Sequence, residues 1–354
     1  MEQTNERARY HYIDVLRVFS ICLVMVLHCF GDYFHKESSI GSTLWWGLGF
    51  VNELCRAGVP IFFMISGFLL LKNDIPDIKE FYKRRLSKIC IPFLCYNAFY
   101  FIARSISEGE FAPKVFIDEF LNSGSAYHLW FIYSLMFIYL MIPFVKMIID
   151  RCSYKMLIGF FIFSIFQTTI KPFINTVSNG YVYIYLNLDG ISGYLGYAIL
   201  GYILGTYDLS ARGKKILYAS AIVSFIAFPL VSMYWAEEGT LSLFNGGYSL
   251  NHYIEAAALF TLFKDKANIK TKFFSAMSLL VMDAYFIHVY IAEKLKLLSW
   301  EVIPVVMITV LVVVTIVTSF LWAFLKEKIV KYIKEVRKNG KKNNGNTPVD
   351  SLSD

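Results

Sequence analysis

The stretch IDVLRVFSICLVMVLHCF, Ile13–Phe30, decides the fold class of this chain. It is apolar over nearly the length that a helix needs to cross a bilayer, which is about 20 residues. It nevertheless contains Asp14, Arg17 and His28. A charged side chain near the middle of a spanning helix costs roughly 2.5–3.5 kcal/mol on insertion scales, so such residues usually face a protein interior or a wet cavity. We therefore expect a membrane-spanning helix with one polar face.

Arg17 and His28 share that face. A separation of eleven residues at 3.6 residues per turn is about 20° more than three full turns, with a rise of about 16 Å. Asp14 lies at the margin of the same stripe. One interpretation is an arginine at the water edge and a histidine packed against a neighbouring helix. The other is a functional pair that lines a polar interior, and the rest of the chain bears on the choice.

The composition extends the membrane interpretation to the whole chain. Of its 354 residues 56% are hydrophobic and only 17% are charged, whereas soluble domains are nearer 25% charged. We predict an all-α, polytopic membrane protein without a cleavable signal peptide. Its six cysteines are scattered through apolar segments, so we expect neither a disulfide framework nor a metal site.

Ten spans give the most economical partition of the chain. They define a cytoplasmic N-terminus over 1–12, a transmembrane domain over 13–325 and a basic cytoplasmic tail over 326–354. The tail should continue the last helix or lie on the inner leaflet, in contact with membrane lipids, and its end should be disordered. The expected spans are Ile13–Phe30, Val51–Leu71, Ile89–Ile106, His128–Ile148, Met156–Ile170, Ile191–Thr206, Ile216–Trp235, Leu250–Phe263, Ser275–Leu295 and Val302–Leu325.

The loops predict the orientation. Most of the 34 Lys and Arg residues fall in loops on the side of the N-terminus, and positive loops stay in the cytoplasm. Both termini are therefore expected to be cytoplasmic. The net charge of +7 follows from this topology, so we do not expect a nucleic-acid partner.

Two motifs lie on or near the cytoplasmic side. GVPIFFMISGF, residues 58–68, contains Pro60, Ser66 and Gly67, which either bend the helix or allow close packing through small residues. FYKRRLSKICIP, residues 81–92, brings Arg84, Arg85 and Lys88 to the mouth of the third span. Such bases are either topology determinants or a clamp for a phosphorylated ligand.

Polar residues from four spans are expected in the outer half or middle of the membrane. Each residue could pair separately with a neighbouring helix, or all of them could surround one outward-opening cavity into which His28 points. We predict the shared cavity, because ionisable groups in the membrane need partners or water. The candidates are His128, Trp130, Asp189, Glu255, Asp283 and His288, and Asn251 and His252 lie at helical contact spacing from Glu255.

Five motifs together resemble the acyltransferase-3 family of integral membrane acyltransferases. They are the Arg17–His28 spacing, GVPIFFMISGFLL, RRLSKICIP, YHLWF and AYFIHVYI, and the resemblance covers residues 12 to about 325. Apolar residues directly after HLWF are similar to the branch of the enterobacterial-common-antigen O-acetyltransferase. The chain departs from the family's usual Arg-x-x-Arg, because Lys88 stands as the second base.

The resemblance implies transfer of an acyl group, commonly acetyl, from cytosolic acyl-CoA to a hydroxyl of a surface glycan or lipid-linked glycan. His28 would be the general base or a transient acyl acceptor, Arg17 would meet the arm of CoA, and Arg84, Arg85 and Lys88 would hold its phosphates. Asp14 and Ser66 would line the pore through which the donor reaches the acceptor. Acetyl-CoA would be a substrate, with no tightly bound cofactor, and the location would be the bacterial inner membrane. A transporter and a structural or sensory membrane protein are the alternatives, and the oligomeric state is left open.

Overall fold

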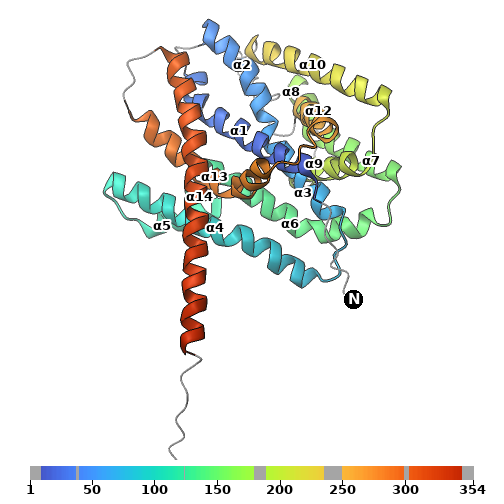
Figure 1. The fold of residues 1–354 in the computed structure, drawn as a ribbon. Coiled ribbons are helices and arrows are strands. Elements are labelled where there is room, and N and C mark those ends of the chain that lie inside the picture. Colours follow the sequence, from blue (N-terminus) through green and yellow to red (C-terminus); the bar gives the residue numbers. More distant parts are fainter. Residues whose placement is uncertain are drawn as a thin grey trace, which may run out of the picture.

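The computed structural model shown in Figure 1 describes residues 9–36, 40–122, 124–178, 189–234, 249–298 and 303–344. Every regular element in these ranges is a helix, so the all-α prediction is confirmed. The elements are α1 (His11–Phe34), α2 (Thr43–Arg56), α3 (Gly58–Leu71), α4 (Ile78–Glu108), α5 (Pro113–Asn122), the 3₁₀ turn η2 (Tyr127–Leu129), α6 (Trp130–Ile149), α7 (Tyr154–Ile165), the π-helical turn η3 (Phe166–Ile170), α8 (Lys171–Val177), α9 (Asp189–Thr206), α10 (Ala211–Tyr234), α12 (Leu250–Lys266), α13 (Lys272–Lys296) and α14 (Pro304–Asn344).

Eight helical segments of the described chain are long and apolar enough to cross a membrane. They correspond to eight of the ten predicted spans, and the polytopic membrane fold is confirmed. The other two predicted spans form α9 and α12, which have 18 and 17 residues. Both pack inside the bundle, where α9 lies against α3 and α12 contacts α1, α3 and α9. The cytoplasmic location of the termini stays a prediction from the loop charges.

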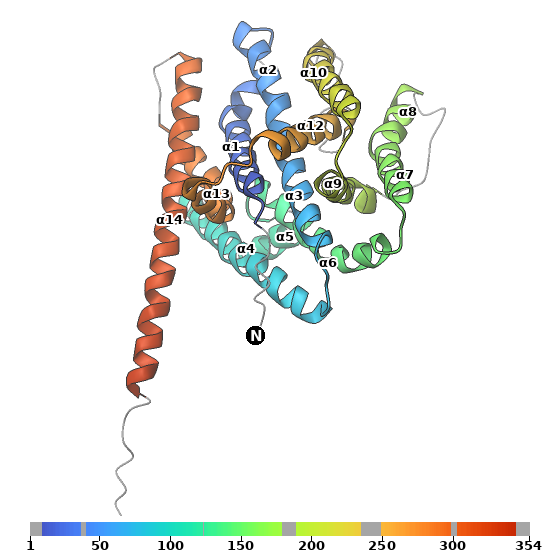
Figure 2. The same ribbon diagram turned by 45° about the vertical axis from the view of Figure 1, so that its right-hand side comes forward.

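The helix α1 lies at the centre of the bundle. It contacts α2, α3, α12, α13 and α14, and Figures 1 and 2 show these helices around it. Of its most apolar window 67% is buried, against 11% for α10 at the periphery. Of its charged residues, Asp14 is buried and Arg17 is partly buried in the bundle.

The second predicted span is two helices, because α2 ends at Arg56 and α3 begins at Gly58. Pro60 has no N–H to donate to the Arg56 carbonyl, which weakens the helix one turn before the proline. At Ser66 and Gly67 the sequence left two interpretations, a bend or opening of the helix and close packing, and α3 is continuous through both residues. The lack of a side chain at Gly67 allows close helix packing, which was the other interpretation.

Two glycines bring the backbones of α3 and α9 into contact. A Cβ on Gly67 would lie 1.9 Å from the carbonyl oxygen of Ala198, and a Cβ on Gly201 would lie 2.0 Å from that of Met64. No rotamer change relieves a clash with backbone. The α3–α9 pair therefore requires glycine at both positions.

We expect Gly67→Ala to lower the thermal stability of the purified protein markedly. The two helices must separate to admit the methyl group, and overpacking of this kind typically costs about 1–3 kcal/mol or more. Gly47→Ala is the matched control, because a Cβ at Gly47 meets nothing within 4 Å. Thermal unfolding in detergent compares the two variants; equal midpoints would contradict the packing described for α3 and α9.

The helix α4 begins at Ile78, well before the predicted third span. The Asp77 side chain accepts a hydrogen bond of 3.0 Å from the Glu80 N–H and so caps the first turn. Gly109, in the left-handed conformation with φ of 72°, ends the helix. The basic motif thus lies within the first turns of α4, which fixes the directions of its side chains. At the other end of the chain, α14 continues the last span to Asn344, so residues 339–344 of the end predicted to be disordered are helical, and residues 345–354 lie outside the described residues.

Candidate active site

Three histidines from different elements meet in the interior of the bundle. The ring of His28 on α1 lies 5.2 Å from that of His288 on α13 and 6.5 Å from that of His128 in η2. The rings of His128 and His288 are 5.2 Å apart. His128 and His288 are fully buried. The structure thus brings three of the sequence-predicted candidates into one cluster, which we call the histidine cluster.

Tyrosines and a lysine orient this cluster. The Tyr127 hydroxyl lies 3.1 Å from Nδ1 of His28. The Nδ1–H of His288 donates to the Tyr285 carbonyl oxygen, while Nε2 of His288 makes no hydrogen bond to a described residue. Lys296 donates a 2.9 Å hydrogen bond to the His28 carbonyl oxygen and pairs with Asp32 at 2.8 Å.

Sequence reasoning did not select Tyr127 or Lys296 as site residues. Tyr127 directly precedes His128 in the YHLWF motif, so proximity to a candidate was the available signal. Lys296 was counted only as a loop charge, and its contact with α1 depends on how α1 and α13 pack.

An intramembrane cavity leads toward the histidine cluster. Arg17, Ser66 and Tyr285 line it, together with apolar residues of α3, α6 and α13. The ring of Tyr285 lies 5.4 Å from His128 and 5.5 Å from His288. The cavity therefore extends between Arg17 and a tyrosine that packs directly on the cluster.

Arg17 is held at this cavity by polar neighbours. Its guanidinium lies 4.0 Å from Asp14 and 3.4 Å from the Ser278 hydroxyl. Asp14 also accepts a 2.9 Å hydrogen bond from Arg9. Arg17 is in addition close enough to Arg85 to be repelled by it. Asp14 thus interacts with two arginines, Arg9 and Arg17. An anion that enters the cavity would be stabilised by the excess positive charge.

A second cavity lies at the start of α4 and is lined by the basic motif. Arg84, Arg85 and Lys88 all face it, as do Asp74 and Asp77. Arg84 is paired with Glu80, one turn earlier on α4. Arg85 and Lys88 make no ion pair with a described residue. The two cavities share no lining residue among the described ones, and Arg85 lies near enough to Arg17 for the two charges to repel each other.

The remaining candidates lie apart from the histidine cluster. Asp283 pairs with Lys326 of α14, and Trp130, which is 37% exposed, stacks on Tyr194 with the ring centroids 5.5 Å apart. Glu255 lies beside Glu53 and His252. Asp189 begins α9, and its side chain lies outside the described residues.

Comparison with known proteins assigns the chain to a family. Residues 10–324 match the acyltransferase-3 family, which is described as "Acyltransferase domain". This chain belongs to the acyltransferase-3 family. Comparisons with curated proteins and with solved structures gave no match. The transmembrane bundle is therefore that of a membrane acyltransferase, and the match covers both cavities and the histidine cluster.

Within this acyltransferase, the histidine cluster has the groups for proton transfer. A neutral imidazole donates from one ring nitrogen and accepts at the other. If His28 donates its Nδ1–H to the Tyr127 oxygen, its Nε2 keeps a lone pair that can take a proton from a hydroxyl. Lys296 fixes the backbone of α1 at this position and so limits the movement of the ring.

Proposed function

We propose that this membrane acyltransferase transfers an acetyl group from cytosolic acetyl-CoA to a hydroxyl of a cell-envelope polysaccharide or lipid-linked glycan, in the bacterial inner membrane. The observation that carries the proposal is the intramembrane cavity, which connects Arg17 with the Tyr285 ring beside the histidine cluster. A narrow, mostly apolar passage suits the arm of an acyl-CoA. No observation favours the transporter alternative.

The donor enters from the side of the basic cavity. Arg85 and Lys88 bind the phosphates of CoA, because neither makes an ion pair with a described acid and charge-assisted hydrogen bonds to phosphate are strong. Arg84 contributes less, since Glu80 already pairs with it. The pantetheine arm then extends past Arg17 and Ser66, so that the thioester approaches His28 while the nucleotide stays at the cytoplasmic end.

The reaction needs one base. Nε2 of His28 takes the proton of the acceptor hydroxyl while the hydroxyl oxygen attacks the carbonyl carbon of the thioester. The C–S bond of the tetrahedral intermediate breaks, the ester forms, and the CoA sulfur leaves with the proton returned by His28. An acyl-histidine route uses the same residue as nucleophile and gives the same products.

The proposal is tested with purified protein, acetyl-CoA labelled in the acetyl group and glycan fractions from the bacterial envelope. We expect release of the CoA thiol that depends on an acceptor fraction, and label in that fraction as an alkali-labile ester. Thioester that stays intact with every fraction, in a protein shown to be folded by size-exclusion chromatography, would contradict the proposal.

A further inference from the structure

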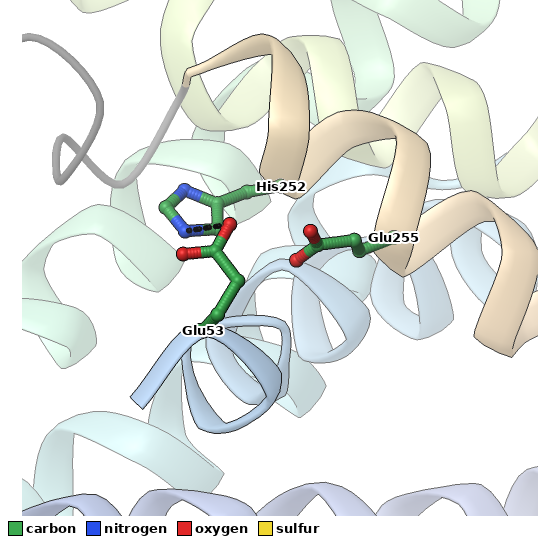
Figure 3. Close-up of side chains that lie close together, drawn as sticks. All are labelled: Glu53, His252 and Glu255. Carbon is green, nitrogen blue, oxygen red and sulfur yellow. Dashed lines mark ion pairs between the residues drawn. The ribbon is translucent and has the colours of Figure 1, made fainter. Parts of the chain in front are cut away.

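A second cluster of buried polar side chains lies between α2 and α12, outside the cavities described above. Glu53 comes from α2, and His252 and Glu255 come from one face of α12 (Figure 3). Glu53 is 2%, His252 0% and Glu255 5% exposed. One potential ligand atom of each residue lies within 4.8 Å of the other two. We call these residues the carboxylate–histidine cluster.

Outer hydrogen bonds hold each of the three side chains. The Ser249 hydroxyl lies 2.9 Å from Nδ1 of His252, and the Ser224 hydroxyl donates a 2.8 Å hydrogen bond to Oε1 of Glu255. The Asn251 amide donates to Oε1 of Glu53. Metal-binding histidines and carboxylates almost always have such outer partners, which orient the ligand atoms.

The inner atoms of the three side chains face one another. Nε2 of His252 lies 3.7 Å from Oε1 of Glu53, as Figure 3 shows, which is too long for a proton to join them. Oε2 of Glu255 is buried and makes no hydrogen bond to a described residue. A buried carboxylate oxygen without a partner is costly. Oε2 of Glu255 therefore needs a proton or a cation at the centre of the cluster.

The neighbouring charges do not supply it. Arg56, one turn along α2, interacts with Glu53. The interactions resolved for Glu255 are with Glu53 and Ser224, neither of which is positive. When both carboxyl groups are ionised, one arginine leaves an excess negative charge in the interior, and a divalent cation would neutralise it.

The donor set suits a first-row divalent ion. Imidazole favours Zn²⁺ and other first-row transition ions, and carboxylate oxygens are accepted by the same ions. Zinc bonds to such atoms are roughly 2.0–2.2 Å long and tetrahedral, so two ligand atoms of one ion lie about 3.4 Å apart. Small side-chain rotations are enough to bring the three atoms, which lie within 4.8 Å, to that spacing.

We propose that Glu53, His252 and Glu255 bind a divalent transition-metal ion, with Zn²⁺ as the preferred occupant. The ion cross-links α2 to α12, and Ser224 extends the link to α10. It therefore stabilises the bundle next to the break between α2 and α3. The expectation that the chain has no metal site rested on cysteine spacing, and none of the three ligands proposed here is a cysteine.

The test is metal content and thermal stability of the full-length protein in detergent. After incubation with Zn²⁺ and removal of unbound metal, we expect close to one zinc per chain by elemental mass spectrometry. Treatment with a chelator should lower the unfolding midpoint by several degrees, and zinc alone should restore it, since a ligand that binds only the folded state stabilises it.

Two variants locate the ion. Glu255→Gln keeps the side-chain shape and removes a charged ligand, so it should lose both the bound zinc and the zinc-dependent shift. His288→Ala removes a ring from the histidine cluster and should keep both. Zinc below about a tenth of an equivalent in the unsubstituted protein, with the same midpoint with and without chelator, would overturn the proposal. So would loss of zinc in His288→Ala, which would place the ion at the histidine cluster instead.

Discussion

Replacing His28 with alanine is expected to lower acetyl transfer by at least about 10²-fold, the typical effect of losing a general acid or base. The substitution removes the only imidazole ring that α1 contributes to the described histidine cluster, and it leaves the Lys296 contact with the backbone of α1 in place. The protein should therefore remain folded and inserted. Initial rates at saturating acetyl-CoA measure the loss.

His35→Ala is the matched control for that substitution. His35 is an exposed histidine at the end of the same helix, and its removal should leave transfer unchanged. If His28→Ala, present at a normal level in the membrane, transfers acetyl at a near-normal rate, His28 has no part in the mechanism.

Replacing Arg85 and Lys88 of the basic cavity is expected to raise the apparent KM for acetyl-CoA about tenfold or more. Hydrogen bonds to charged groups contribute roughly 1.5–3 kcal/mol each, and solvent at the cavity mouth reduces that amount. The variant is Arg85→Ala combined with Lys88→Ala. Acetyl-pantetheine has no nucleotide phosphates, so its KM should change much less.

A second pair of bases controls for charge and topology. Arg151→Ala with Lys155→Ala removes the same charge from another loop on the predicted cytoplasmic side and should leave both KM values unchanged. An equal loss with acetyl-CoA and acetyl-pantetheine in the Arg85 and Lys88 variant would indicate a folding or topology defect rather than lost phosphate binding.

The sequence predicted the elements whose signals are local. Periodicity placed Arg17 and His28 on one face of α1, and the structure has Arg17 at the intramembrane cavity and His28 in the histidine cluster. The cost of polar groups in a membrane predicted that such residues gather, and His128 and His288 do lie beside His28. The early start of α4 also had a local signal, the Asp77 cap three residues before Glu80, which the span-based partition passed over.

The sequence could not specify which helices lie side by side. Glu255 was expected in a cavity with His28, yet it lies against Glu53 of α2, a residue that nothing in the sequence distinguished. Asp283 was expected in the same interior and pairs with Lys326 of α14 instead. The first pairing joins α12 with α2 and the second joins α13 with α14, and helical spacing within one segment does not encode which helices meet.

The central claim is that one acyl-CoA extends from the basic cavity to His28, and a structure of the protein with a non-hydrolysable acetyl-CoA analogue tests it most directly. The account predicts that the CoA phosphates contact Arg85 and Lys88 and that the arm passes Arg17. It also predicts the acetyl carbonyl at roughly 3–4 Å from the ring of His28, near enough for attack by a hydroxyl that this ring activates. A nucleotide bound on another face of the bundle, or an acetyl group separated from His28 by packed side chains, would contradict it.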